Sequence, residues 1–444
     1  MILAWIIFFI YTVWAIFSLK KAILAWMPFQ LLFNSQVALR YSSPALYLNL
    51  SVTLMLAFIY LIEGRNKKQF NSDRFLFKPI LILNLISYVF SLMFSIVPFS
   101  QVLMETVRTF LNDFLFIYLF QKALCDCKDI RLVFKCTIIT TFIICLLGVY
   151  ESIVGTNPWL DYVYNNSSQE FQRMYYIPGN VWRRYGLVRA YSVFDIHIKF
   201  GTVCVFLLFA IGSAYYHKWL SKKKLLLMLS MILLFAGVFM SNSKTGLLGL
   251  VVMIFAIFKP KDVFKPQYII PLVVIIIGVF VMFPDYMLNF TSLFDEDAAE
   301  EGNGSTVAMR QVQFNVAIGM FEQSPLFGNG LGSISALMKY GNNADILGSE
   351  SSWMKILPER GLLGAITYVA SYGYMYKKFS DYIPKFQLLA FLASLLLMET
   401  ATGFMDMSLY GSVLILVRRA NMIFKPNNQP TKNWKEKLLG VSAD

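Results

Sequence analysis

Apolar segments, each about long enough to cross a bilayer, recur along this chain from end to end and limit what it can fold into. A helix needs roughly 20 mostly apolar residues to span the hydrocarbon core. Hydrophobic residues make up 57% of the chain and charged residues 15%, against roughly 25% charged in an ordinary soluble domain. We therefore expect an all-α fold, a polytopic bundle of transmembrane helices that forms one membrane domain over residues 1–444.

The number of spans depends on one segment near the N-terminus. Ala22–Leu39 is apolar enough to insert, but Pro28 and Gln30 also allow a re-entrant or interfacial helix. The expected count is 13 spans with the N-terminus outside, or 12 spans with the N-terminus inside. The first span lacks the basic start and the cleavage site of a signal peptide, so we expect it to be retained. The other predicted spans are Ile2–Leu19, Tyr47–Ile62, Phe77–Val97, Val102–Phe120, Val133–Val154, Val193–Tyr216, Leu225–Met240, Thr245–Phe258, Tyr268–Phe283, Met354–Tyr376, Phe386–Phe404 and Ser408–Ile423.

Basic residues cluster in six connectors between the spans, which hold 25 of the 39 lysines and arginines. Such clustering is the positive-inside signal and predicts that these connectors and the tail 425–444 face the cytoplasm. It also predicts affinity for anionic lipid and argues against nucleic-acid binding as the use of the net charge of +13. The connectors are Glu63–Lys78, Gln121–Lys135, His217–Lys224, Lys259–Lys265, Lys377–Lys385 and Arg418–Asp444.

Two long polar loops, 155–192 and 284–353, are then predicted to lie together on the outer face, the larger one containing short helices. In a bacterium this is the periplasmic face of the inner membrane. The first loop gathers Trp182, Arg183, Arg184, Tyr185 and Arg189. Arginines here run against the positive-inside bias, so they favour the binding of an anionic substrate, with loop packing or head-group anchoring as the alternative.

Motifs in and beside the larger loop resemble those of a known family. Residues 310–330, RQVQFNVAIGMFEQSPLFGNG, combine an arginine, a short amphipathic helix and a Pro-Leu-x-Gly-x-Gly turn. Residues 350–364, ESSWMKILPERGLLG, resemble the run that ends the large loop of the bacterial O-antigen ligase and O-antigen polymerase superfamily. Glu350 and Ser351 stand where the ligases carry histidine and asparagine, so the chain looks more like the polymerase branch. Weaker similarity covers RAYSVF from Arg189 and SNSKTG, which contains Lys244.

The resemblance implies glycosyl transfer from an undecaprenyl-pyrophosphate-linked oligosaccharide, with a second such molecule as the acceptor. Arginine suits the departing diphosphate because it stays protonated and binds phosphate bidentately. Arg189 and Arg310 are the first candidates for this role, and Arg183, Arg184 and Lys244 are further anion-binding candidates. Glu350 is the candidate general base, since the attacking hydroxyl must lose a proton. No metal and no cofactor are expected, because no convincing ligand cluster is present.

Other residues are candidates for substrate binding or for structural roles. Trp182, Tyr185 and Trp353 are candidates for stacking on sugars, and Ser351 for a polar substrate contact. Bland alternatives are a solvated first-turn position for Arg310, a helix cap for Glu350 and a snorkelling side chain for Lys244. Glu359 is expected to form a salt bridge with Arg360, and GNGLG from Gly328 to form a tight turn. Charged pairs are expected within spans between Glu105 and Arg108 and between Asp195 and Lys199, while Glu399 is costly without a partner.

The sequence thus predicts a repeat-unit polymerase for O-antigen, capsule or exopolysaccharide, in contact with the bilayer and with a chain-length regulator as a candidate partner. A ligase that transfers the finished glycan to lipid A core or to protein is the nearest alternative. A flippase for the same lipid-linked sugars is the alternative from another class, although no internal repeat of the transporter type is evident.

Overall fold

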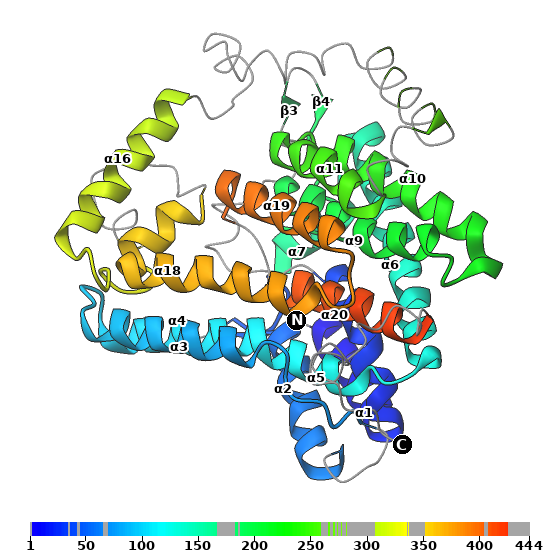
Figure 1. The fold of residues 1–444 in the computed structure, drawn as a ribbon, viewed down its shortest axis with the longest axis horizontal. Helices are drawn as coiled ribbons and strands as arrows, with labels where there is room; N and C mark the ends of the chain where they lie inside the picture. Colours follow the sequence, from blue (N-terminus) through cyan, green and yellow to red (C-terminus); the bar gives the residue numbers. More distant parts are fainter. Residues whose placement is uncertain are drawn as a thin grey trace, which may run out of the picture.

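The computed structural model describes residues 2–33, 36–41, 45–64, 70–166, 183–184, 187–258, 307–334, 336, 351–403 and 407–424, and isolated positions between 265 and 281. Over these residues the chain is almost entirely helical, which confirms the all-α prediction (Figure 1). The α-helices are α1 Ile2–Phe29, α2 Leu48–Ile59, α3 Lys78–Met93, α4 Phe99–Phe110, α5 Phe116–Ala123, α6 Cys127–Val154, α7 Pro158–Asn166, α9 His197–Tyr216, α10 Lys224–Met240, α11 Lys244–Ile257, α16 Val307–Gln323, α18 Trp353–Phe379, α19 Lys385–Ala401 and α20 Met407–Phe424.

Short irregular helices and two small hairpins complete the described structure. The hairpins are antiparallel, β1 Ala38–Arg40 with β2 Leu46–Tyr47, and β3 Arg183–Arg184 with β4 Leu187–Val188. The 3-10 helices are η1 Gln30–Leu32 and η4 Ser221–Lys223, and the π-helical turns are η2 Tyr60–Gly64 and η3 Leu111–Leu115. Because η3 joins α4 to α5 without a break, residues 99–123 form one continuous helical stretch.

Three of the described helical segments are long and apolar enough to cross a membrane by length and composition: Ile2–Leu32, Cys127–Val154 and His197–Tyr216. Four shorter apolar helices accompany them, Leu48–Glu63, Lys78–Met93, Lys224–Met240 and Lys244–Ile257. Most of the predicted span Tyr268–Phe283 lies outside the described residues. The membrane character of the fold is confirmed, and the exact span count stays a prediction.

The N-terminal region forms a helical hairpin whose second arm is buried over residues 22–27. Backbone angles at Ser18 break α1 into two parts, and beside this break Lys20 Nζ lies 2.7 Å from Asp129 Oδ2 at the start of α6. At the other end of the hairpin, Trp5 Nε1 donates to the Leu39 carbonyl at 3.1 Å. Residues 20–39 therefore run back along the bundle from the basic end to the opposite end. This path favours the 13-span alternative for the ambiguous segment.

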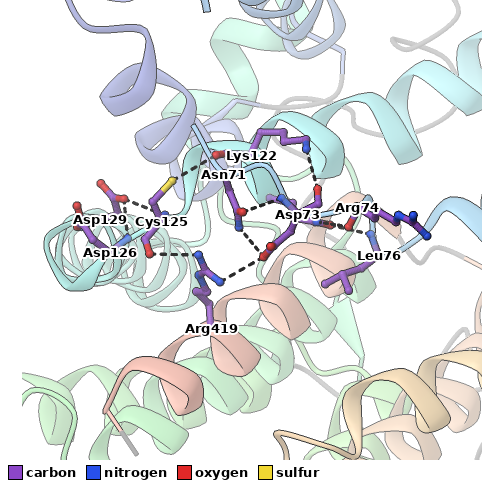
Figure 2. A network of polar contacts seen from close by, with 10 residues as sticks. Asn71, Asp73, Arg74, Leu76, Lys122, Cys125, Asp126, Asp129 and Arg419 are labelled. Atoms are coloured by element: carbon purple, nitrogen blue, oxygen red, sulfur yellow. Dashed lines mark hydrogen bonds and ion pairs between the residues drawn. The ribbon is translucent and has the colours of Figure 1, made fainter. Parts of the chain in front are cut away.

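Residues from three of the predicted basic connectors form one network of polar contacts (Figure 2). Arg419 at the end of α20 lies 3.4 Å from Asp73 Oδ2 and donates to the Cys125 carbonyl at 3.3 Å. Lys122 Nζ donates to the Asp73 carbonyl at 2.7 Å, and Gln121 accepts the Leu76 N–H at 2.9 Å. The described parts of the connectors 63–78, 121–135 and 418–444 thus lie together, as the positive-inside pattern predicts.

Helix α9 is the centre of the larger helical group. Most of its residues are buried, and it packs on α6, α10, α11 and α20. Glycines allow these close approaches: a Cβ at Gly201 would lie 3.2 Å from the Ser241 Cβ, and one at Gly212 would lie 2.8 Å from Ile257. A second group consists of α3, α4, α16 and α18, in which α18 packs between α3 and α16 (Figure 1).

Two predicted intramembrane ion pairs are present. Arg108 Nη1 lies 3.7 Å from Glu105 Oε2, and Lys199 Nζ lies 3.8 Å from Asp195 Oδ1. Arg108 also stacks over the Tyr47 ring at 4.8 Å. Pairing at i,i+3 and i,i+4 on one helix face lowers the cost of these charges, which confirms the prediction made from their spacing.

Candidate active site

Arg189 lies in the short segment between β4 and α9 and is buried, with 4% of its surface exposed. The next residue, Ala190, donates its N–H to the Met240 carbonyl at the end of α10, at 2.9 Å. The turn after Met240 leads directly to Lys244, the half-buried first residue of α11, whose N-cap Ser243 accepts the Gly246 N–H. The structure therefore places the segments that carry Arg189 and Lys244 side by side.

The segments that carry Arg189 and Lys244 form what we call the basic corner, and Arg183 on β3 lies in the same region. A Cβ at Gly155, the residue that ends α6 in a left-handed conformation, would lie 3.5 Å from Arg183 Nη2. The guanidinium thus lies close to the C-terminal end of α6, where the helix dipole favours a cation. Three of the predicted anion-binding side chains, Arg183, Arg189 and Lys244, come from elements that meet at the ends of α6, α10 and α11.

A buried carboxylate that the sequence analysis did not select holds this corner together. Glu151 Oε2 accepts hydrogen bonds from Asn157 Nδ2 at 2.8 Å, from the Tyr191 N–H at 2.9 Å and from the Ser192 N–H at 2.7 Å. Burial raises the pKa of the Tyr191 phenol, Arg189 acts to lower it and Glu151 acts to raise it. The cost of a charge at the end of an apolar span was the one signal that could have identified Glu151.

His197 opens α9 next to this corner. Its ring packs edge-on against the Tyr191 ring with centroids 5.6 Å apart, and only 9% of its surface is exposed. The His197 ring is therefore held against the Tyr191 ring at the start of α9.

The two motifs of the larger loop lock together through backbone hydrogen bonds. Asn329 N–H donates to the Pro358 carbonyl at 2.8 Å, and Gly330 N–H to the Glu359 carbonyl at 3.2 Å. In the reverse direction, residues 362 and 363 donate to the carbonyls of residues 325 and 326 at 2.8 and 3.1 Å. The turn 325–332 and the segment 358–363 therefore form one rigid unit, although about 30 positions of sequence separate them.

Glycine is required where these segments touch. Gly328 and Gly361 have φ values of 75° and 61°, which an L-residue with a side chain adopts only with strain. A Cβ at Gly361 would also lie 2.6 Å from the Leu326 carbonyl carbon. Gly330 and Gly332 have positive φ as well. The tight-turn interpretation of GNGLG is confirmed.

Glu359 and Arg360 have different partners from those expected. The Glu359 carboxylate accepts the Gly332 N–H at 3.0 Å, and its carbonyl accepts the Ser91 hydroxyl at 2.6 Å. Arg360 instead donates to Ser87 Oγ on α3 and lies over the Tyr88 ring at 4.4 Å. The expected salt bridge between Glu359 and Arg360 is wrong, because the two side chains point to different elements.

Arg310 lies near the start of α16 with its side chain exposed, while α16 packs on α18. Asn329 Nδ2 donates to the Met320 carbonyl at 2.6 Å, which ties the end of α16 to the turn. With a rise of about 1.5 Å per residue, Arg310 lies about 15 Å along the helix from Met320. Figure 1 shows α16 at one side of the bundle and the β3–β4 hairpin at the top. The convergence of Arg310 and Arg189 on one substrate stays a prediction.

Ser351 and Trp353 lie against the C-terminal end of α19. The Ser352 N–H donates to the Glu399 carbonyl at 2.9 Å, and Ser351 is buried. The Glu399 carboxylate accepts the Tyr372 hydroxyl at 2.7 Å and also the Tyr368 hydroxyl. The Trp353 ring packs edge-on against Tyr368 at 5.1 Å. Glu399, flagged in the sequence only for its cost in the bilayer, thus has two partners beside the end of the larger loop.

Several predicted site residues lie outside the described part of the chain. Glu350, Trp182 and Tyr185 belong to this group, as does the side chain of Arg184. Their assignments stay predictions. Within the described residues, no group of three or more histidine, cysteine, aspartate or glutamate side chains could hold a metal ion.

The helical fold and the region that contains Arg183, Arg189 and Lys244 define a polytopic membrane protein with basic side chains gathered at the ends of its helices. Residues 229–369 match the family model described as O-Antigen ligase. The match covers Lys244, Arg310 and both interlocking motifs, and it leaves Arg183 and Arg189 outside. No curated protein matches the chain significantly. The resemblance to the O-antigen ligase and polymerase superfamily is confirmed, and it supports a membrane glycosyltransferase-like enzyme without separating polymerase from ligase.

Proposed function

We propose that this protein polymerises undecaprenyl-pyrophosphate-linked oligosaccharide repeat units at the outer face of the bacterial inner membrane. The observation that carries the proposal is the buried Arg189 beside the turn that leads to Lys244. Burying a charged guanidinium costs free energy, and a site that binds an anion is a reason to accept this cost. A lipid diphosphate is such an anion at the membrane surface.

In the proposed reaction, the bond between the sugar C1 and the diphosphate oxygen of the donor breaks, and its electron pair leaves with undecaprenyl pyrophosphate. Arg189 stabilises the charge that develops on this oxygen, with Arg310 as a second donor and Arg183 and Lys244 as supporting cations. The acceptor sugar hydroxyl forms the new bond to C1. Its proton passes to Glu350, because the guanidinium groups are already protonated and have no site that could accept a proton.

Two observations favour different members of the superfamily. The matched family is described as O-Antigen ligase, which keeps the ligase as the second candidate. Glu350 in place of a loop histidine favours the polymerase, because it offers a carboxylate base where the ligases present an imidazole. The deep burial of Arg189 favours an enzyme over the flippase. Its neighbours Val188 and Ala190 are both held by pairing with other segments, and a side chain fixed in this way suits chemistry at one position.

A gene deletion separates the two enzymes. Loss of a polymerase leaves surface lipid with a single repeat unit, whereas loss of a ligase leaves none. Elongation of lipid-linked repeat units by the purified protein in detergent would exclude the flippase. Surface lipid without any repeat unit in the deletion strain would replace the polymerase with the ligase. Failure to elongate an authentic donor would favour the flippase.

A further inference from the structure

The segment after Arg189 is fixed although it belongs to no helix or strand. Tyr191 and Ser192 are 4% and 0% exposed, and the Ser192 hydroxyl donates to the Ile144 carbonyl at 2.6 Å. Ser192 has a φ of 56°, a left-handed conformation that a residue with a side chain adopts only when its surroundings enforce it. Contacts with neighbouring residues must therefore stabilise the turn at Ser192.

Glu151 and Asn157 provide that hold from the end of α6. Both backbone N–H groups, of Tyr191 and of Ser192, point to Glu151 Oε2 at 2.9 and 2.7 Å. Asn157 Nδ2 bridges the same carboxylate oxygen at 2.8 Å and the Ser192 carbonyl at 2.7 Å. Asn157 Oδ1 in turn accepts the Leu160 N–H at 3.1 Å. The two side chains therefore clamp both polar sides of the Ser192 backbone.

A carboxylate suits this position better than a neutral acceptor. One oxygen that accepts three donors forms stronger bonds when it is charged, because hydrogen bonds to an ionised acceptor are about twice as strong as neutral ones. Both Glu151 and Arg189 act on the pKa of the Tyr191 phenol, so the carboxylate and the guanidinium both lie near this side chain.

We propose that Glu151, assisted by Asn157, is a positioning residue that sets the place of Arg189 at the lipid diphosphate. The inference rests on the proposed function. A carboxylate with a purely structural role would stabilise the bundle but would not act through Arg189.

The test is a double-mutant cycle on the full-length protein in detergent. Glu151→Gln keeps an acceptor oxygen but removes its charge, so it should lower kcat for elongation at least about tenfold, since small displacements of a catalytic group cost up to roughly 100-fold. In an Arg189→Lys background the same change should add less than about threefold, because residues that act as one unit are not additive. The overturning results are wild-type turnover in Glu151→Gln, or losses that multiply.

Asp129→Asn is the matched control. Asp129 is also a buried acidic residue of α6 that accepts two backbone N–H groups, from Cys125 and Asp126, but it lies at the opposite end of the helix. It should lower thermal stability without changing kcat per folded molecule. An equal kcat loss in both variants would assign Glu151 a structural role.

Hydrogen exchange of residues 190–193 separates this inference from the proposed function. Glu151→Ala should speed exchange of the Tyr191 and Ser192 amides, and Glu151→Gln should do so less strongly. Unchanged protection in both variants would overturn the clamp even if the protein polymerises glycans. Faster exchange in a protein that elongates nothing would retain the clamp and reject the polymerase.

Discussion

Arg360 on α18 donates from Nε to the hydroxyl of Ser87 on α3 at 2.9 Å, across 273 positions of sequence. Its Nη2 adds bonds to Asn84 and Thr367, both at 2.9 Å. The guanidinium therefore fastens the rigid unit of turn 325–332 and segment 358–363 to α3. The end of the larger loop is thus anchored to a helix from the first quarter of the chain.

Replacing Arg360 should loosen this anchor. Arg360→Met removes the donors and leaves buried acceptors unpaired, at a cost of about 1–3 kcal/mol in the free energy of unfolding. The measurement is the thermal midpoint in detergent. Arg131→Ala, which changes an exposed arginine on α6, is the control and should leave the midpoint unchanged. An unshifted midpoint in Arg360→Met would show that the anchor contributes nothing to stability.

Substitution of Gly361 should destabilise the unit formed by turn 325–332 and segment 358–363. Gly361→Ala places a Cβ against the Leu326 backbone at φ 61° and ψ −159°, a region almost restricted to glycine, where another residue costs about 1–3 kcal/mol before any collision is counted. Gly319→Ala is the matched control, because nothing lies within 4 Å of a Cβ at that position in α16. The control should stabilise the helix by about 0.5–1 kcal/mol. Equal thermal midpoints for the two variants would show that the close contact between turn 325–332 and segment 358–363 does not require glycine at position 361.

Much of this arrangement could be predicted from the sequence. The apolar periodicity predicts the helical bundle, and the basic connectors predict that the segments of Asp73, Lys122 and Arg419 lie together. The run GNGLG predicts a turn because glycine alone adopts positive φ freely. These features are local, so each can be inferred from neighbouring residues.

The partners across the bundle could not be predicted. The bonds from Arg360 to α3 and from the Ser192 N–H to Glu151 depend on which helices pack together. A single sequence with apolar residues on nearly every helix face does not specify this packing. The same reason led to the wrong salt bridge: Glu359 and Arg360 are adjacent, yet each has a nearer partner from a distant segment. Among the site residues, adjacency of the Arg189 and Lys244 segments emerges only once α10 is packed beside the segment that leads into α9.

The proposed roles of the arginines predict a selective loss of activity. Arg189→Ala and Arg310→Ala should each lower elongation by about 100- to 1000-fold, since this is the usual cost of losing one donor to a developing oxyanion. Both proteins should remain in the membrane at wild-type amounts. Chain-length profiles of surface glycan are the measurement, with Arg131→Ala as the control. Wild-type profiles in either variant would remove that arginine from the mechanism.

The proposed base and the metal-free chemistry can be examined in one assay. Glu350→Gln should reduce the rate of the chemical step more than the affinity for the donor, because a general base acts in the transition state. Glu322→Gln, at an exposed position on α16, is the matched control. Treatment with EDTA should leave wild-type activity unchanged. A requirement for added divalent ion would contradict the proposed chemistry, and a change confined to KM would exclude Glu350 as the base.

Acid should weaken the start of α6 through Asp126. Burial acts to raise the pKa of this carboxyl, but the N–H groups of Asp129 and Lys128 and the Lys20 ammonium lower it below its ordinary value of 3.8. Because the folded pKa is depressed, the stabilising contribution is present above that ordinary value and is lost as the pH falls through the lowered pKa. Asp126→Asn keeps a good N-cap but does not titrate, so its thermal midpoint should fall less steeply below about pH 4 than that of the wild type. Asp126→Ala should lower the midpoint at every pH, by the equivalent of about 1 kcal/mol. Parallel curves for the wild type and Asp126→Asn below pH 4 would show that the capping carboxylate does not contribute to acid sensitivity.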